Sequence, residues 1–363
     1  MTIYVGSLKF SPIFKSHCCA FGKACEQEGY SVKYLFSHEY DWMLPPQIRE
    51  KTIFIGNSTS ITSMIQDSVS LKNKQIIKKA FLKEPPQLVY LHNFHFLNQY
   101  IAKMTRKNQG RFVYHVHEPY VKNKKAHGGF HQYWLNLFEF FQARLLNHTD
   151  VAIVSSKEAS SLFNFRYPSF QGKKMEIPLL YEDLGESDMD ANARQFITFV
   201  GPPVPAKNPE KFIEIIKYSE NKNLNLQFLL ISRDEIKTSE YDALDNLKVI
   251  SQKRLSDQEF GKLIKQSIAV ITPYKRETQS SVILTSYMYG TPIISSNVGG
   301  LPEFVSDGKT GYLLSPEDDA AEWVKRIFLI RESFQAFSDS SRAYFVQNFS
   351  GLNWKTYLYM LLG

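Results

Sequence analysis

The chain has 363 residues, 43% hydrophobic and 22% charged, which is the composition of a globular protein that can bury large cores. No stretch approaches the roughly 18–20 uninterrupted apolar residues of a membrane-spanning helix. The start, Met1 to Ser7, enters a strand pattern without the basic region of a signal peptide. The length suits two domains of ordinary size.

The charge is unequal along the chain. Residues 1–185 hold 23 Lys and Arg against 14 Asp and Glu, a net of +9, whereas residues 186–363 hold 20 against 22, a net of −2. A basic first half indicates an anionic partner such as phospholipid, a lipid pyrophosphate or a polyanionic glycan, and plain solubility is the alternative explanation. We do not expect nucleic acid, because the aromatic residues cluster with aliphatic ones and not with the basic runs.

Short apolar runs alternate with helical stretches in the first half. They predict six strands, at residues 3–6, 31–36, 52–55, 88–91, 111–116 and 150–154. This alternation predicts a doubly wound α/β domain. A helix over 16–29 carries all three cysteines, Cys18, Cys19 and Cys25, and an odd, clustered set favours buried thiols of a cytosolic protein over disulfides or a zinc site.

A helix predicted over residues 130–147 has two aromatic stripes. One stripe is Trp134, Phe138, Phe141 and Leu145, and its neighbour is Tyr133, Leu137, Phe140 and Arg144. Our hypothesis is that one stripe packs in the core while the other, with Lys122, Lys124 and Lys125, meets a membrane surface or a lipid-linked acceptor. A wholly buried helix is the alternative.

The polar stretch 181–193 is the expected linker. Beyond it the pattern predicts strands at 196–200, 226–231, 247–250, 267–272, 291–296 and 312–314, and a capping box from Ser256 to Glu259. The tail is predicted to be helical over 320–332, 334–347 and 354–362. We therefore expect an N-terminal acceptor-binding domain (1–185), a C-terminal nucleotide-sugar-binding domain (186–345) and a final crossover helix (346–363).

Two loops of the second half come directly after strands and so lie at the carboxyl edge of the predicted sheet. One contains Glu277, and the other contains Gly299 and Gly300, which are expected to open a short helix over 301–305 and to offer backbone N–H groups to a phosphate. A tight turn is the alternative interpretation of the two glycines. Asp318 and Asp319 lie at a helix start and fit a cap better than a manganese motif.

A longer set of motifs indicates a particular kind of site more specifically than the two glycines do. It comprises Glu277, Gly290-Thr-Pro-Ile-Ile294, Asn297-Val-Gly-Gly-Leu-Pro-Glu303 and Asp307-Gly-Lys-Thr-Gly-Tyr-Leu313, and it resembles the nucleotide-sugar site of GT-B glycosyltransferases of the family-four, group 1 type. That family has a second glutamate where this chain has Thr285. In its first phosphate loop the family has Gly, then Arg, then Lys; Gly201 and Lys207 match, but Pro202 replaces the Arg.

The resemblance implies two Rossmann-like domains facing across a cleft, with the last helix crossing back to the first. It implies catalytic roles for Glu277 and for His117. His115 and His117 flank the end of the fifth strand, and alternation along the strand predicts that both face the same side. The implied donor-binding residues are Gly201, Lys207, Thr285, Asn297, Gly299, Gly300 and Glu303. On the acceptor side the implied residues are Ser7, Phe10 and Glu118.

The resemblance also implies a retaining hexosyltransferase that uses a nucleotide-diphosphate sugar, with no cofactor and no metal. The expected acceptor is a glycan or lipid-linked molecule of cell-surface polysaccharide, lipopolysaccharide or glycolipid synthesis. We expect a cytoplasmic protein, peripheral on the inner membrane face. Because Pro202 and Thr285 depart from the pattern, an inactive binding subunit of a glycosyltransferase complex is the alternative, and a sugar-nucleotide epimerase is a third possibility.

Overall fold

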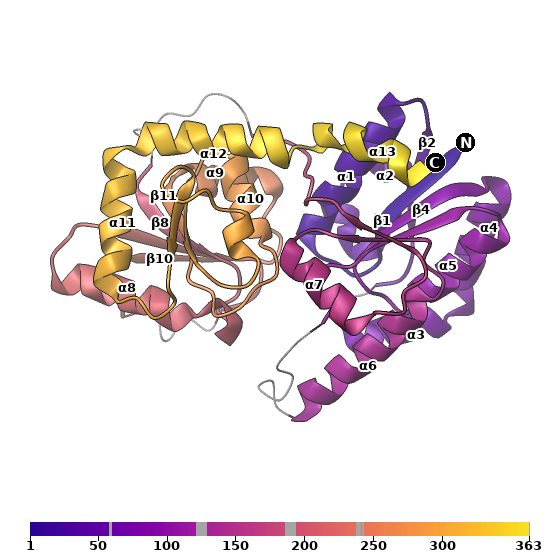
Figure 1. Ribbon diagram of the computed structural model, residues 1–363, viewed down its shortest axis with the longest axis horizontal. Helices are drawn as coiled ribbons and strands as arrows, with labels where there is room; N and C mark the ends of the chain where they lie inside the picture. Colours follow the sequence, from indigo (N-terminus) through magenta and orange to yellow (C-terminus); the bar gives the residue numbers. More distant parts are fainter. Residues whose placement is uncertain (58–59, 121–128, 186–193, 237–240, 242, 363) are drawn as a thin grey trace. The chain divides into compact units, whose positions relative to one another are not determined.

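A computed structural model describes residues 1–57, 60–120, 129–185, 194–236, 241 and 243–362 (Figure 1). The chain forms two compact units, one of Met1–Glu182 with Ser350–Gly363 and one of Asp183–Phe349. These divisions fall near the expected ones at 185 and 345. Each unit is a parallel sheet with helices packed on it. None of the described helices is long and apolar enough to cross a membrane.

The first unit has a seven-stranded parallel sheet in the order β3-β2-β1-β4-β5-β6-β7. Its strands are β1 (Thr2–Ser7), β2 (Ser31–Phe36), β3 (Thr52–Phe54), β4 (Pro86–His92), β5 (Arg111–His115), β6 (Val151–Val154) and β7 (Lys173–Glu176). The prediction of six strands missed β7. This edge strand reads Lys-Lys-Met-Glu and buries only Met175, so it has no apolar run to reveal it.

Helices cover both faces of this sheet. They are α1 (Pro12–Gln27), α2 (Pro46–Glu50), α3 (Ile61–Val69), α4 (Leu71–Lys83), α5 (Asn98–Lys107), α6 (Gly129–Leu146) and α7 (Lys157–Arg166), with a 3₁₀ turn at His38–Met43. Successive strand residues point to opposite faces, so Ile3 and Tyr4 belong to two separate cores. All three cysteines are buried free thiols on α1, as predicted.

The second unit has a six-stranded parallel sheet in the order β10-β9-β8-β11-β12-β13. Its strands are β8 (Phe196–Val200), β9 (Gln227–Ser232), β10 (Leu247–Ser251), β11 (Ser267–Thr272), β12 (Ile293–Ser296) and β13 (Gly311–Leu314), and its helices are α8 (Pro209–Asn221), α9 (Asp257–Lys265), α10 (Ser281–Met288), α11 (Ala320–Glu332) and α12 (Phe334–Asn348). Every residue of β8 and β11 is buried, which explains their mainly apolar sequence. The predicted capping box begins α9.

Both sheets reverse their strand order once, between β1 and β4 in the first and between β8 and β11 in the second. In open parallel sheets a ligand binds outside the carboxyl ends of the strands at such a switch point. The loops after β8 and β11 are those that contain Lys207 and Glu277. The fold therefore brings the motifs of the second half to the position where this architecture binds its ligands.

The last segment returns to the first unit. After α12 the chain passes a 3₁₀ turn (Gly351–Asn353) into α13 (Trp354–Leu362), which packs on α1. The Trp354 ring contacts the Phe21 ring edge-on at 4.9 Å, and Leu358 and Leu361 are fully buried. The expected crossover helix is thus confirmed.

Candidate functional site

Three loops at the carboxyl edge of the second sheet are joined by backbone hydrogen bonds. The Lys275 N–H, after β11, donates to the Ala206 carbonyl, after β8, at 2.9 Å. The Gly300 N–H, after β12, donates to the Glu277 carbonyl at 3.0 Å. These two bonds fix the loop that contains Glu277 between its neighbours, so the three loops form one local structure at the switch point.

Lys207 lies at the centre of this group of loops. It ends a 3₁₀ turn (Pro205–Lys207), and its Nζ donates to the Val200 carbonyl at 3.2 Å and lies 5.5 Å from the centre of the Tyr274 ring. Burial lowers the pKa of the Lys207 ammonium, while the negative charges of Glu277 and Asp234 oppose that shift. Lys207 is therefore a partly desolvated cation held among backbone and aromatic groups, a suitable environment for an anion.

Gly201 makes room for that cation. Its φ is +104°, a conformation that side chains rarely adopt, and a Cβ built on it would lie 2.0 Å from Lys207 Nζ. The glycine of the predicted phosphate loop is thus required by its backbone angle, and a side chain at this position would displace the lysine ammonium. Pro202 is the next residue and is half-buried.

Glu277 is half-buried, and its Oε1 accepts the Thr278 N–H at 3.2 Å. Burial raises the pKa of the adjacent Tyr274 phenol well above its ordinary value, and the Glu277 charge adds to the effect. The carboxylate and the Lys207 ammonium are close enough to influence each other electrostatically. One acceptor group and one cation therefore share this edge of the sheet.

The short helix predicted over 301–305 begins at the expected residue but is a 3₁₀ helix of three residues, Leu301–Glu303. It is too short to have a useful dipole. The Gly300 N–H already donates to Glu277, and a Cβ on Gly299 (φ +53°) would lie 2.1 Å from the Glu277 carbonyl oxygen. The glycine pair thus allows the two loops to pack closely, and phosphate binding by its N–H groups stays a prediction for Gly299 alone.

The remaining predicted donor residues surround these loops. Thr285 is half-buried on α10. Asn297 is exposed and its N–H donates to the Leu314 carbonyl at 2.7 Å, and the N–H of the exposed Glu303 donates to the Gly300 carbonyl at 3.1 Å. The sequence did not indicate a role for Tyr274 or Asp234. An aromatic or acidic residue after a strand is common, and neither residue belongs to a motif with a recognisable spacing.

In the first unit, four histidine rings stack at the carboxyl ends of β4 and β5. The rings of His115 and His117 lie 4.2 Å apart with 9° between their planes, and those of His17 and His92 lie 5.3 Å apart with 10°. His92 Nδ1 and His117 Nε2 are 3.2 Å apart, as in an N–H···N hydrogen bond. The predicted histidine pair is therefore part of a larger cluster. His92 pairs with His115 across the strands, a register that the sequence alone does not reveal.

Burial lowers the pKa of every imidazole in this cluster. The His17 pKa falls to about 4, and those of His92, His115 and His117 fall well below the ordinary value, with the neighbouring histidines adding to the effect. His17 is tied by its Nδ1 to the Leu180 carbonyl at 2.7 Å. At neutral pH the cluster is an uncharged hydrogen-bonding surface.

The three ring nitrogens of His92, His115 and His117 lie within 4.8 Å of one another, close enough to suggest a metal. A ligand nitrogen directs its lone pair in the plane of its ring, however, and the parallel stacked rings of His115 and His117 cannot both direct theirs at one ion. Both nitrogens of His115 are also engaged at 2.7 Å, with the Tyr90 and Ser155 hydroxyls. These residues do not fit a metal site.

The predicted acceptor-side residues lie at the end of β1 or just after β1 and β5. The buried Ser7 hydroxyl donates to the Lys9 carbonyl at 2.8 Å, so it is engaged within its own loop. Phe10 packs edge-on against Tyr40 at 4.9 Å, and Glu118 is exposed. Lys122, Lys124 and Lys125 lie outside the described residues. Of the aromatic stripes on α6, Phe138 and Phe141 pack against the core, whereas Tyr133 and Phe140 are exposed.

The fold is that of the GT-B proteins. Sucrose-phosphate synthase from Thermosynechococcus elongatus matches it with a TM-score of 0.74 at 16% identity, over 99% of both chains. HepE from Anabaena, in a crystal structure with UDP-glucose, matches with a TM-score of 0.70 at 12% identity, over 100% of this chain and 99% of that one. Identities this low establish the shared architecture alone.

Residues 188–343 of this chain match the model of the family described as glycosyl transferases group 1. A curated relative, an uncharacterized 41.2 kDa protein in the cps region of Klebsiella pneumoniae, is 25% identical over 122 residues. The match covers 34% of this chain and 33% of the relative, so the chain spans about a third of the length of that relative.

Proposed function

We propose that this protein is a glycosyltransferase that moves a hexose from a nucleotide-diphosphate sugar to a glycan or a lipid-linked acceptor. The observation that carries the proposal is the group of three joined loops at the β8/β11 switch point, where Lys207 and Glu277 lie together. The family match of the second unit supports it, and so does the likeness to HepE, whose crystal structure contains UDP-glucose.

Each proposed role is derived from the chemistry of the donor. A glycosyl donor presents a diphosphate leaving group and an anomeric carbon that becomes cationic in the transition state. In the proposal Lys207 neutralises the diphosphate as a point charge, and Glu277 accepts hydrogen bonds from sugar hydroxyls. His117 contributes a neutral hydrogen-bonding ring to the sugar. The proposal includes retention of the configuration at the anomeric carbon and a reaction without a metal ion. Both rest on the family resemblance.

The proposed setting is cell-surface polysaccharide, lipopolysaccharide or glycolipid synthesis in the cytoplasm, at the inner face of the membrane. The relative in the cps region supports a polysaccharide role. The basic first half, with a net charge of +9 over residues 1–185, supports an anionic surface or a lipid-linked acceptor as its partner.

A second candidate function is an inactive binding subunit of a glycosyltransferase complex. Two observations favour it, the Pro202 and Thr285 positions where the resembling family has Arg and Glu. Arg clasps a diphosphate with two hydrogen bonds, and a threonine offers one uncharged hydroxyl in place of a carboxylate. Both replacements should lower the affinity of the site for the nucleotide.

Calorimetric titration with UDP, GDP and ADP tests the donor site. We expect one nucleotide to bind and Lys207→Ala to weaken it about ten- to a hundredfold, since a charged hydrogen bond contributes roughly 1.5–3 kcal/mol. Lys275→Ala is the matched control: this exposed lysine on the same edge lies 3.8 Å from Glu210, and its loss should change affinity by less than about twofold. No binding of any nucleotide would remove the enzyme proposal.

Sugar transfer by Glu277→Ala separates the two candidate functions. An active enzyme should lose transfer from the nucleotide-sugar that binds, measured as nucleotide released in the presence of acceptor, while the exposed control Glu210→Ala keeps it. If the wild type binds nucleotide but shows no transfer, and Glu277→Ala binds its protein partner as before, the binding-subunit function is the correct one.

A further inference from the structure

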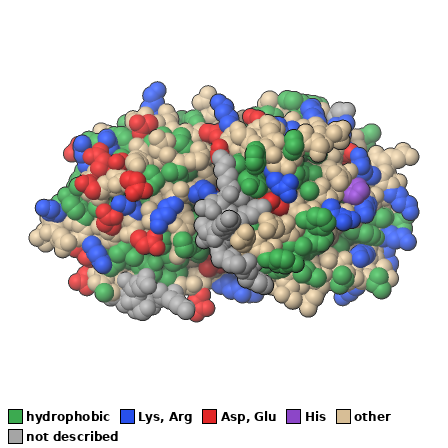
Figure 2. All heavy atoms as spheres, turned by 60° about the horizontal axis from the view of Figure 1, so that its bottom comes forward, with side chains coloured by type: hydrophobic (Ala, Val, Ile, Leu, Met, Phe, Trp, Pro, Cys, Tyr) green, Lys and Arg blue, Asp and Glu red, His purple; other side chains and the backbone are tan. Residues whose placement is uncertain are grey.

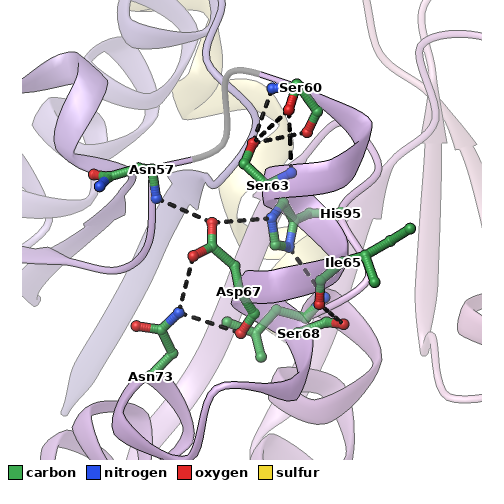
Figure 3. Close-up of polar contacts among 9 residues, drawn as sticks. Asn57, Ser60, Ser63, Ile65, Asp67, Ser68, Asn73 and His95 are labelled. Atoms are coloured by element: carbon green, nitrogen blue, oxygen red, sulfur yellow. Dashed lines mark hydrogen bonds and ion pairs between the residues drawn. The ribbon is translucent and has the colours of Figure 1, made fainter.

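Helix α3 directs a row of aliphatic side chains to solvent. Ile61, Ile65 and Val69 succeed one another at one-turn intervals on the same face and are 37%, 44% and 66% exposed, whereas Met64 on the other face is buried. Figure 3 shows the Ile65 side chain extending away from the polar groups around it. A single exposed aliphatic residue is ordinary, but a continuous row marks an interaction surface.

Helix α4 adds lysine side chains to this surface. Its sequence holds five lysines and no carboxylate. Lys72, Lys78, Lys79 and Lys83 are exposed, and Leu71 and Leu82 lie among them, 73% and 66% exposed. Lysine stems lie along apolar surface while their ammonium groups reach water or phosphate, so this mixture is typical of a helix at the interface of an anionic bilayer.

A polar network holds the inner face of α3 in place (Figure 3). Ser60 and Ser63 form a capping box at its start. Asp67 accepts the Asn57 N–H at 3.0 Å and the Asn73 side-chain amide at 3.2 Å, and it lies 4.0 Å from His95. Because these contacts fix the polar face of α3 against the unit, its aliphatic row faces outward.

Helix α6 lies on the other side of the same loop. Loop 93–97 presents His95 to α3, while its Phe94 and Phe96 contact Phe138 and Phe141 of α6 edge-on at 5.0 Å. Both helices lie toward the bottom of the first unit in Figure 1, the side turned forward in Figure 2, where hydrophobic side chains adjoin Lys and Arg side chains. Tyr133 and Phe140 of α6 are also exposed.

We propose that the outward faces of α3, α4 and α6 dock the protein on an anionic phospholipid bilayer. Charge complementarity identifies the partner, because aliphatic side chains among lysines, with no carboxylate on α4, suit a surface that is both negative and penetrable. Loop 93–97 comes directly after β4, so the part of the docked face that adjoins this loop lies at the carboxyl edge of the first sheet. This inference rests on the proposed function in one respect, since that edge is where a lipid-linked acceptor would arrive.

Flotation of the full chain with vesicles tests the proposal. We expect binding to phosphatidylcholine vesicles that contain phosphatidylglycerol, little binding to phosphatidylcholine alone, and weaker binding in high salt. The double variant Lys78→Glu/Lys79→Glu should lower the partition coefficient at least about tenfold, and Ile65→Ser/Val69→Ser about tenfold through lost insertion. Circular dichroism and Tm confirm that each variant is folded.

Lys355→Glu and Leu352→Ser are the matched controls, since both positions are exposed on the C-terminal segment of the same unit. They should float like the wild type. The proposal is overturned if the wild type does not bind anionic vesicles, or if the α3 and α4 variants bind as the controls do. UDP, GDP and ADP binding is measured on the same preparations. A chain that binds nucleotide but no vesicle refutes docking alone, and the reverse result refutes the proposed donor site alone.

Discussion

At the scale of single residues, the second unit concentrates its unusual features around one lysine. Lys207 has its pKa lowered by burial, and its ammonium occupies the space that Gly201 leaves open. A bound diphosphate would add negative charge beside this ammonium and raise its pKa again, so binding would offset the cost of desolvation. The lysine is thus placed to gain more from an anion than an exposed lysine would.

Gly201→Ala should therefore affect binding as well as stability. The methyl group would lie 2.0 Å from Lys207 Nζ in a backbone conformation with φ +104°, so the lysine must move. We expect nucleotide affinity to fall about tenfold or more, and the free energy of unfolding by about 1 kcal/mol. Gly308→Ala is the control: φ is +73° there, and no atom lies within 4 Å of the added methyl group. Calorimetry and urea unfolding should show a stability loss in both variants and a binding loss in Gly201→Ala only.

Some features of this site could be predicted from the sequence, and others could not. Lys207 and Gly201 could be predicted because their spacing matches a family motif. The packing of Tyr274 on Lys207 could not, because it depends on how the loop after β11 turns back towards β8. The hydrogen bond from Gly300 to Glu277 was equally inaccessible, since two glycines indicate freedom of the backbone and not which partner the freed backbone meets.

At the scale of elements, the carboxyl ends of β4 and β5 and the middle of α1 together build the histidine stack. Its inner members, His17, His92 and His115, are buried, so the folded unit favours the neutral form of each ring. The strand pattern placed His115 and His117 on one face correctly. It could not identify His17, which lies on a helix far away in sequence, or His92, which pairs with His115 in a strand register that the sequence does not reveal.

The stack should make stability depend on pH. Unfolded His17 titrates near its ordinary pKa of 6.5, whereas the folded ring has a pKa of about 4, so between these values the unfolded state binds more protons. The free energy of unfolding should be level above pH 6.5 and fall below it by ~1.4 kcal/mol per pH unit for each such histidine. Urea unfolding between neutral pH and pH about 4 measures the slope. His17→Gln should lower this slope by ~1.4 kcal/mol per pH unit, which corresponds to one proton fewer taken up on unfolding. An unchanged slope would contradict this account.

Strands were predicted well where both faces are buried, because β8 and β11 consist mainly of apolar residues. The edge strand β7 was not predicted, because one of its faces needs no apolar residues. Helix α3 has its aliphatic row on the outside, while Met64 is buried and Asp67, half-buried, accepts hydrogen bonds on the inner side. Periodicity assigns an apolar row to the core, so no sequence rule would have oriented this helix correctly.

At the scale of the whole molecule, the chain builds one unit, completes a second, and returns to the first. Unit one is therefore discontinuous, with Ser350–Gly363 adding α13 to the core beside α1. The Gly351 N–H donates to the Tyr181 carbonyl at 2.6 Å, which binds the returning segment to the point where the first unit ends. The first unit cannot complete its core until the second has been synthesised.

Trp354 should accordingly control the stability of the first unit although it lies near the end of the chain. Its ring is fully buried and contacts Phe21 at 4.9 Å and Tyr90 at 5.8 Å, so Trp354→Ala should lower the free energy of unfolding of that unit by about 3–5 kcal/mol. Lys355→Ala, the next residue but an exposed one, should have little effect. Urea unfolding monitored by hydrogen exchange separates the units, and amides of β1 and β4 should lose protection while those of β8 and β11 keep it. Equal loss in both sheets would mean that the two units unfold together and that the second depends on the first.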